Sequence, residues 1–545
     1  MQKKELITIY REGLKLFQNG HTKMALQKLQ SLPPIAEIPF YCGIMQLDLG
    51  LLNEACKSLE YFIVHNNKAT SHNIEISLLE LIKLKANLGD LPSALKYIHR
   101  LLTNHHTPAV TYLHWIAIAP LIYKWQLSDI VFQGLCNTTF SQAEYHDLDL
   151  TLLHLHYLDL PANTIANIHK LWGDLNQTSN YFKNFNQHKS DNTNIHIGYL
   201  SPDFRQHSVG LFLKEIISNH SKDFDITLFS LKTYNDELSI WFQKHFKVID
   251  ISNLSPKDAA LTIYNHQLNI LIECAGHTQN NGLEICKLKP APKIITAWGY
   301  PNTTGLKEID FRLSDTLVDL PDAQNLYSEI LIRMPKHIFL PFIPFKKPPN
   351  TINLKQQLNI PEDCYIIGSF NNIAKLNPKL IALWNQILQN NPKVHLIISS
   401  RNFKLEDTKQ RLLKDLSVNI NKNRITILPG EKDIMRHRQN IIACEFCLDT
   451  YPYNGTTTTC EILAMGVPVL TLQGDTHVKR TSSAFLHSFN LTDCITTTKQ
   501  QYLSQADLFI KNGTSYLKDK INNHLKTINN KNWTTEFEIL LKNLL

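Results

Sequence analysis

Apolar residues in the first hundred positions recur three or four apart, which is the spacing of helices that bury one face. Three segments share a pattern in which a glycine precedes an alanine by five positions and an aliphatic residue follows the alanine by four. Such a glycine ends one helix, and the small alanine lets the next helix pack closely against it. The alanines lie 30 and 39 residues apart, which brackets the tetratricopeptide period of about 34 residues. We therefore expect three degenerate tetratricopeptide-like repeats over residues 5–105, with a generic helical bundle as the alternative. The three sets are Gly20, Ala25 and Leu29; Gly50, Ala55 and Leu59; and Gly89, Ala94 and Ile98.

The helical pattern continues over residues 106–190 and ends in a polar stretch, NQTSNYFKNFNQHKSDNTN, that is typical of a linker. From residue 195 short apolar runs alternate with helical segments, which indicates a parallel sheet covered by helices. The expected strands are one starting at Ile195, then Asp225–Leu231, Asn269–Cys274 and Ile294–Trp298, and the expected helices are Phe212–Ser218 and Lys257–Asn265.

A proline-rich joint, PFIPFKKPPN, precedes a second series of the same kind. Two such domains in tandem form a cleft between the carboxyl ends of their strands, where ligands of these sheets bind. The predicted fold class is α + α/β, with a tetratricopeptide-like helical region and linker over residues 1–190. A Rossmann-like lobe follows over residues 194–345, and a second over residues 355–545 includes the C-terminal helices. The strands expected in the second series are Tyr365–Ser369, Val394–Ser399, Ile425–Leu428 and Val467–Leu472, with helices at Pro378–Gln389 and Arg411–Leu416.

Composition narrows the functional classes. At 545 residues, with 43% apolar and 19% charged residues, the chain is an ordinary globular protein of several domains. Its net charge of +7 is small for this length, so we expect no nucleic-acid partner. The N-terminus lacks the apolar core of a signal peptide, and the longest apolar stretch, Trp115–Tyr123, is too short to span a membrane. Ten cysteines without a framework spacing indicate a reducing, cytoplasmic location, and Cys444 and Cys447 are interpreted as core residues.

The stretch YPYNGTTTTCEILAMGVPVLTL places four threonines, Thr456–Thr459, between a turn and a helix. Asn-Gly favours the turn, Gly466 and Pro468 end the helix, and a buried strand follows. The first turn of a helix has unpaired N–H groups and the positive end of the helix dipole, so added hydroxyls make a site for a phosphate. A capped helix with spare threonines is the alternative interpretation.

Other polar residues follow strand ends at the same predicted edge. In GSFNNIAKLNPK, Asn371, Asn372 and Lys375 follow a strand, and a lysine there can neutralise a phosphate. In SPDFRQHSVG and ECAGHTQNNG, His207 and His277 do the same, and histidine can act as a base or a hydrogen-bond donor near neutral pH. A solvated lysine and structural histidines are the alternatives for these positions.

Several enzyme classes lack their signature. The sequence contains no G-x-x-x-x-G-K-[ST] loop, and no G-x-G-x-x-G opens either domain, which argues against P-loop NTPases and nicotinamide enzymes. The cleft turns contain no D-x-D that would hold the cation of a metal-dependent sugar transferase. We expect neither a metal nor a cofactor.

Five motifs in order over residues 195–500 resemble the O-GlcNAc transferase / SPINDLY family of protein glycosyltransferases. They are IGYLSPDFRQHSVG, LIECAGHTQNNGL, KPAPKIITAWGYPNTTGL, GSFNNIAKLNPK and LDTYPYNGTTTTCEILAMGVPVLTLQG. The resemblance implies a GT-B fold, a nucleotide-sugar donor, no metal, and inversion at the anomeric carbon with transfer to Ser or Thr hydroxyls of proteins. It also implies that acceptor proteins bind along the helical repeats.

The resemblance suggests roles for individual residues. Lys375 matches the lysine that contacts the donor diphosphate, and Thr457 and Thr458 match the phosphate-binding hydroxyls. Thr456 stands where the animal-type enzymes have His, and Asn372 where they have Gln. His207 matches a cleft histidine proposed as the base.

Further positions are implied less directly. His277 matches a histidine of SPINDLY-like members and is grouped with the catalytic residues, and Glu461 is grouped with the nucleotide-sugar residues. His437 and Asp433 compete for one nucleotide-contacting position, and Lys432 is a candidate for stacking on the base.

The donor has two candidates. FNN and GTTTTCE look closer to SPINDLY-type O-fucosyltransferases than to animal O-GlcNAc transferases, but relatives that share the pattern differ in donor. We favour UDP-GlcNAc, with GDP-fucose as the alternative. The alternative hypothesis for the function is a catalytically inactive scaffold, and the intact Lys375 and threonine run argue against it.

Overall fold

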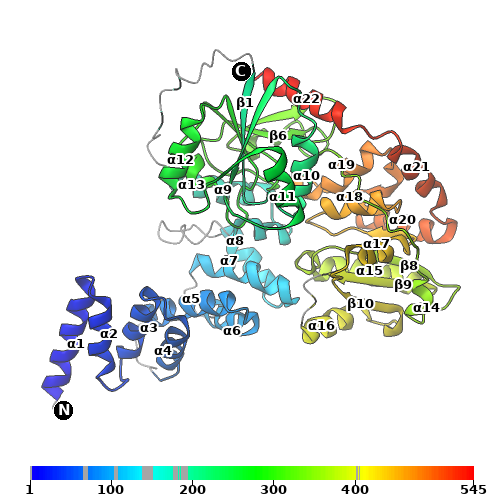
Figure 1. Cartoon of the computed structure of the whole chain (residues 1–545). Helices are drawn as coiled ribbons and strands as arrows, with labels where there is room; N and C mark the ends of the chain where they lie inside the picture. Colours follow the sequence, from blue (N-terminus) through cyan, green and yellow to red (C-terminus); the bar gives the residue numbers. More distant parts are fainter. Residues whose placement is uncertain are drawn as a thin grey trace. The chain divides into compact units, whose positions relative to one another are not determined.

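A computed structural model describes residues 3–65, 71–103, 108–137, 151–175, 182, 185, 194–400, 403 and 405–545. The chain divides into two compact units, Met1–Ile122 with Leu127–Phe140, and Tyr123–Gln126 with Ser141–Leu545 (Figure 1). Nearly all of the expected linker, residues 176–194, lies outside the described residues. None of the described helices combines the length and the apolarity that a membrane crossing requires.

The first unit consists of successive helical hairpins. Gly20, Gly50 and Gly89 all have positive φ and separate the two helices of a hairpin, as their spacing predicted. The alanine five positions after each glycine is fully buried where the second helix packs on the first. The helices are α1 (Lys3–Gln18), α2 (Thr22–Gln30), α3 (Ile38–Asp48), α4 (Leu52–His65), α5 (Ser71–Asn87), α6 (Leu91–Leu102), α7 (Ala109–Ile118) and α8 (Ser128–Asn137).

The first lobe of the second unit is built on a seven-stranded, wholly parallel sheet in the order β3-β2-β1-β4-β5-β6-β7. Helices cover the sheet, as the alternation predicted, but β3, β6 and β7 were not anticipated. The strands are β1 (Ile195–Ser201), β2 (Phe224–Ser230), β3 (Lys247–Asp250), β4 (Ile270–Glu273), β5 (Lys293–Thr296), β6 (Phe311–Asp315) and β7 (Ile330–Met334). The helices are α10 (Ser208–Ile217), α11 (Glu237–His245), α12 (Pro256–Asn265) and α13 (Leu283–Cys286).

The second lobe has a six-stranded parallel sheet in the order β10-β9-β8-β11-β12-β13. Cys444 and Cys447 are buried in this lobe, and all ten cysteines are free. The strands are β8 (Tyr365–Ser369), β9 (Val394–Ser400), β10 (Ile425–Pro429), β11 (Phe446–Leu448), β12 (Val469–Leu472) and β13 (Ile495–Thr496). The helices are α14 (Leu354–Gln357), α15 (Pro378–Asn390), α16 (Glu406–Leu416), α17 (Ile434–Ile442), α18 (Thr457–Ala464), α19 (Thr481–Ser488), α20 (Lys499–Asn512) and α21 (Ser515–Leu525).

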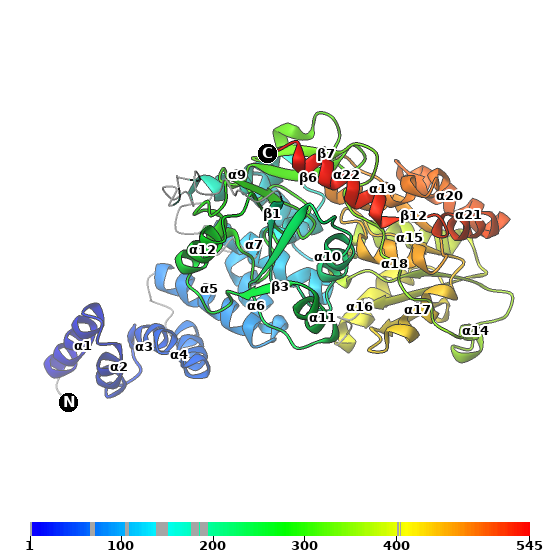
Figure 2. The ribbon, with the colours of Figure 1, turned by 45° about the horizontal axis from the view of Figure 1, so that its top comes forward.

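The last helix, α22 (Asn530–Lys542), returns to the first lobe (red in Figures 1 and 2). Trp533, Phe537 and Leu541 are part of the hydrophobic core of that lobe, and the Trp533 indole N–H donates to the Ile338 carbonyl oxygen at 2.8 Å. Its position in the chain predicted a place in the second lobe, but chain order alone does not show where its apolar face packs.

The helix α9 (Ala162–Leu175) also packs on the first lobe. Gly173 approaches the backbone of Gly305 so closely that a Cβ would lie 1.9 Å from its carbonyl oxygen. His169 Nε2 lies 2.5 Å from the Tyr300 hydroxyl. Residues 151–175 thus belong to the unit of the two sheets, although their helical pattern predicted a place in the N-terminal helical region.

Candidate active site

A pocket of about 230 Å³ lies between the two lobes at the carboxyl edges of their sheets. It brings together three of the predicted features, namely His207, Lys375 and the threonines Thr456–Thr458. The first lobe and the segment after it contribute His207, Ser208, Val209, Phe212, Trp298, Gly299, Tyr300, Pro301, Phe339 and Leu340. The second lobe contributes Lys375, Tyr453, Thr456, Thr457, Thr458, His477 and Thr481.

The threonine run forms the start of α18, as predicted. Thr456 is the N-cap residue and makes no side-chain cap hydrogen bond, so its hydroxyl does not satisfy the first-turn N–H groups. The turn before the helix is held by Asp449, whose buried carboxylate accepts from the Gly455 N–H at 2.8 Å and the Thr471 hydroxyl at 2.7 Å. The first turn of the helix therefore faces the pocket with N–H groups that, within the described part of the chain, have no side-chain cap, and with a positive dipole end.

Lys375 ends a short 3₁₀ turn, Ile373–Lys375, that follows β8. Its ammonium donates to the Asn454 carbonyl oxygen at 2.8 Å and lies 4.0 Å from the centre of the Tyr453 ring. Burial lowers the pKa of Lys375 to about 8, although the charge of Asp449 acts in the opposite direction. The lysine is thus held beside the threonine turn by a carbonyl and an aromatic face.

Tyr453 was not predicted as a site residue, although it lies within the motif that carries the threonines. The Lys375 ammonium lies over its ring. His156 and Tyr157 also pack against this ring, at 6.1 and 5.9 Å between ring centres. Both partners lie in the 3₁₀ helix Leu152–Tyr157, more than 290 positions away in sequence. An aromatic residue beside a glycine turn carries no local signal of such a role.

His207 is the N-cap residue of α10 and lines the pocket from the first lobe. Nδ1 accepts from the Val209 N–H at 3.3 Å and also lies 3.2 Å from an Asp203 carboxylate oxygen. With Nδ1 accepting from Val209, the neutral ring carries its proton on Nε2. Nε2 becomes a proton acceptor in the other tautomer, in which Nδ1–H faces Asp203. The side chain is 39% exposed, so His207 lies near the mouth of the pocket.

His277 is not in this pocket, contrary to its expected place among the catalytic residues. The side chain is fully buried, and its Nε2–H donates to the Thr304 carbonyl oxygen at 2.7 Å. The ring packs edge-on against Trp172 of α9 and against Tyr300, at 4.5 and 5.2 Å. A substrate does not reach it in this arrangement, and its contacts join α9 to the first lobe.

Four of the residues expected to bind the nucleotide-sugar, Asn372, Lys432, His437 and Glu461, do not line the pocket. Asn372 caps the turn before Lys375 by accepting from the Ala374 N–H at 3.1 Å, and Lys432 is exposed before α17. Both residues lie in the second lobe, and their contact with a nucleotide stays a prediction.

His437 and Glu461 lie together, on α17 and α18. His437 Nε2 is 3.7 Å from one Glu461 oxygen, and Arg438 Nε donates to the other at 2.8 Å. Asp433 instead caps α17 by accepting from the Met435 N–H at 2.8 Å. Of the two alternatives for the nucleotide-contacting position, His437 is the one beside Glu461.

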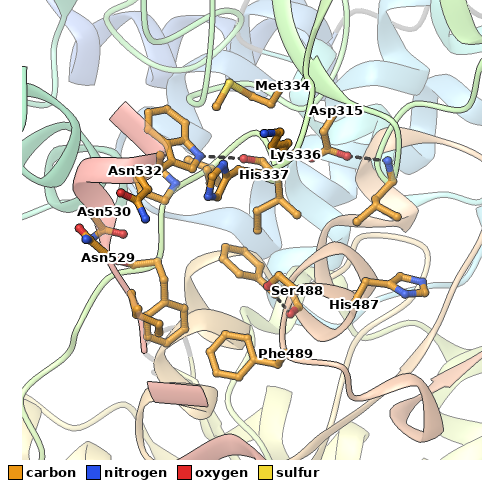
Figure 3. A pocket seen from close by; sticks show the side chains of 18 of the residues that line it. Asp315, Met334, Lys336, His337, His487, Ser488, Phe489, Asn529, Asn530 and Asn532 are labelled. Atoms are coloured by element: carbon orange, nitrogen blue, oxygen red, sulfur yellow. Dashed lines mark hydrogen bonds between the residues drawn. The ribbon is translucent and has the colours of Figure 1, made fainter. Parts of the chain in front are cut away.

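A second pocket, of about 400 Å³, lies where the first lobe, α19 and the start of α22 meet (Figure 3). His337, Asn529, Asn530 and Asn532 line one part of it, and Ser488 and Phe489 at the end of α19 line another. None of the predicted site residues lines it. Within the described ranges, no group of three or more His, Cys, Asp or Glu side chains is arranged to hold a metal ion.

The chain matches the sequence pattern of a known protein family. The sequence pattern of glycosyl transferase family 41 matches residues 167–342 and 346–543. A protein of Oryza sativa subsp. japonica named "Probable UDP-N-acetylglucosamine--peptide N-acetylglucosaminyltransferase SPINDLY" is 32% identical over 371 residues, 65% of this chain. A protein of Arabidopsis thaliana with the same name is 32% identical over 363 residues, also 65% of this chain. Each match covers 39% of the relative, so the chain spans about two fifths of the length of these curated proteins.

Among solved structures, an O-GlcNAc transferase mutant from Thermobaculum terrenum covers 100% of this chain and 98% of its own. The TM-score is 0.70 and the sequence identity is 19%. At this identity the likeness shows a shared fold, with a helical region followed by two Rossmann-like lobes in the GT-B arrangement.

Replacing Thr457 and Thr458 together by Val tests the phosphate role of the α18 start. Valine keeps the branched shape but removes the hydroxyl donors, and a hydrogen bond to a charged group contributes about 1.5–3 kcal/mol. We expect UDP or GDP to bind at least about tenfold more weakly by titration calorimetry, with uridine or guanosine affinity unchanged. Thr535→Val, a helical threonine outside the pocket, is the control. An equal loss for nucleoside and diphosphate would show damage to the lobe instead.

Because the pKa of Lys375 is about 8, both diphosphate binding and the stability of the fold should depend on pH near this value. The folded pKa of about 8 lies below the ordinary 10.5, so diphosphate binding to the free protein should weaken as pH rises from 7 to 9. Between those two pKa values the unfolded chain binds more protons than the folded chain, so the contribution of Lys375 to the free energy of unfolding rises with pH. Below pH 8 the charged lysine destabilises the fold most.

Lys375→Met is the matched variant, because it keeps the length of the side chain without the charge. It should melt at a higher temperature than wild type at pH 7 and show weak diphosphate binding with no pH dependence between 7 and 9. A wild-type binding curve that is flat across this range would contradict the assignment of the charge to Lys375.

Proposed function

The chain belongs to glycosyl transferase family 41, and we propose that it is an inverting, metal-independent protein O-glycosyltransferase that uses a nucleotide-sugar donor. The observation that carries this proposal is the desolvated Lys375 ammonium beside the unpaired start of α18, in a pocket between two Rossmann-like lobes. Such a pocket is suited to a diphosphate, because it offers fixed positive charge and aligned donors.

The chemistry follows from where charge develops. An acceptor hydroxyl oxygen attacks the anomeric carbon of the donor sugar while the bond from that carbon to the β-phosphate oxygen breaks. The leaving oxygen takes the electron pair, and its growing negative charge is stabilised by Lys375 and by Thr456–Thr458 at the start of α18. These groups serve where other sugar transferases use a cation.

The acceptor proton needs a base near the mouth of the pocket, where the acceptor enters. His207 is the candidate, because its Nδ1 is 3.2 Å from Asp203 and its ring is partly exposed in the pocket. The Asp203 carboxylate orients the ring and stabilises the imidazolium that forms when Nε2 takes the proton.

UDP-GlcNAc is the favoured donor, and the names of the rice and Arabidopsis relatives support it. GDP-fucose is the second candidate because the FNN and GTTTTCE segments look closer to the SPINDLY type. The acceptors are proteins, and we propose that they bind along the helical hairpins of residues 5–105, since stacked hairpins present an extended surface.

Transfer to a protein acceptor in excess EDTA tests the reaction and its metal independence together. We expect sugar transfer from UDP-GlcNAc, measured by mass spectrometry of the acceptor, at the same rate with and without EDTA. Transfer from GDP-fucose instead would select the second donor. Activity that EDTA abolishes and Mn²⁺ restores would contradict metal independence, and the absence of both transfer and nucleotide binding would indicate a scaffold.

Deleting residues 1–105 tests the docking role of the helical hairpins. The truncated chain should still hydrolyse the donor, because the pocket lies wholly in the second unit. Its kcat/KM toward intact protein acceptors should fall, while that toward a short acceptor peptide changes little. A thermal melt of the truncated chain is the control for folding. Undiminished transfer to intact proteins would show that the acceptors dock elsewhere.

A further inference from the structure

A second histidine–carboxylate pair, His477 and Asp319, borders the pocket. His477 lines the pocket, and Asp319 contacts His477 from outside the lining. His477 Nδ1 is 2.9 Å from an Asp319 carboxylate oxygen, and both side chains are only 2% exposed. His477 comes from the second lobe, in the 3₁₀ turn His477–Lys479 after β12, whereas Asp319 follows β6 of the first lobe. The pair therefore joins the two lobes where they enclose the pocket.

Asp319 is held as a carboxylate by several donors. It accepts hydrogen bonds from the Tyr327 hydroxyl at 2.6 Å and from the Ser314 hydroxyl. Burial alone would raise the pKa of Asp319, but His477, Arg312 and Ser314 bring it well below its ordinary value. An ionised Asp319 accepts from Nδ1–H of His477 and fixes that tautomer, which leaves Nε2 as the nitrogen that can bind a ligand.

The surroundings of His477 indicate which part of a donor it meets. Its turn lies beside the start of α18, since the Asn454 N–H donates to the Val478 carbonyl oxygen at 3.1 Å. On the other side its ring packs edge-on against Phe339 at 4.7 Å. His477 is thus placed between the phosphate end of the pocket and the wall formed by the first lobe.

Charge argues against a phosphate contact for this pair. With His477 protonated the pair is neutral, and with His477 neutral the pair carries one negative charge. Neither form attracts an anion, in contrast to Lys375, which lacks a carboxylate in contact among the described residues. A neutral hydroxyl is the ligand that suits an imidazole held in this way.

We propose that His477, oriented by Asp319, binds a hydroxyl group of the donor sugar and is a specificity-determining residue. The inference rests on the proposed function, because it needs a sugar attached to the diphosphate. A buried polar group of this kind discriminates strongly, since a sugar without the matching hydroxyl leaves the imidazole nitrogen unpaired. The exposed His207 then serves the acceptor, and the buried His477 serves the donor.

The test compares the affinity of a nucleoside diphosphate with that of the matching nucleotide-sugar, UDP with UDP-GlcNAc or GDP with GDP-fucose. His477→Asn places an amide where Nδ1 lies and keeps a donor for Asp319, but it has no group at the Nε2 position. We expect it to weaken nucleotide-sugar binding about tenfold and to leave diphosphate binding unchanged. His477→Gln, whose amide reaches the Nε2 position, should restore part of the loss.

His220→Asn is the matched control, because His220 Nδ1 pairs with Glu538 at 2.9 Å and is as buried, but lies outside the pocket. It should change neither affinity. Donors that each lack one sugar hydroxyl complete a double-mutant cycle. The transfer rates should show coupling between His477 and a single hydroxyl, which a purely structural role would not produce.

Three results would overturn the inference. Equal weakening of diphosphate and nucleotide-sugar by His477→Asn, with a lower melting temperature, would mean that the pair only holds the lobes together. An unchanged preference for the nucleotide-sugar would mean that His477 does not touch the sugar. A wild-type protein that binds neither ligand would overturn the proposed function as well, which distinguishes that failure from the other two.

Discussion

The site depends on one positive charge that the fold holds out of water. The Lys375 ammonium is satisfied by a backbone carbonyl and an aromatic ring, and among the described residues it forms no ion pair. Burial lowers its pKa to about 8, which means that the empty pocket disfavours the charged form. An anion in the pocket would meet an ammonium that is already desolvated, and this strengthens their electrostatic interaction.

The neighbouring groups are arranged so that this charge stays available. The charge of the buried Asp449 carboxylate acts on Lys375, but its oxygens accept from the Gly455 N–H and the Thr471 hydroxyl. These bonds hold the turn before α18 and thereby aim the first turn of that helix into the pocket. Tyr453, which carries the ammonium on its face, is supported in turn by residues that precede the first sheet. The buried Asp449 carboxylate thus orients the turn before α18, and the Lys375 ammonium stays available to a ligand.

Both lobes must meet for the pocket to exist, and the chain crosses between them more than once. The helix α22 follows the second lobe in sequence but completes the core of the first. The His477–Asp319 pair joins the lobes directly. Two histidines then line the pocket at different depths: the His207 side chain is 39% exposed and the His477 side chain only 2% exposed.

The sequence by itself determined the features that depend on neighbours in the chain. Glycine and alanine spacing predicted the hairpins, alternation predicted two parallel sheets, and strand ends predicted Lys375, the threonine turn and His207 in one pocket. The turn after β12 obeys the same strand-end rule, which would have found His477. Tertiary structure alone decided the depth of each histidine, the burial of His277 behind Tyr300, and the place of α22. Those outcomes depend on which apolar faces pack together across hundreds of residues, and local periodicity does not indicate which faces pair.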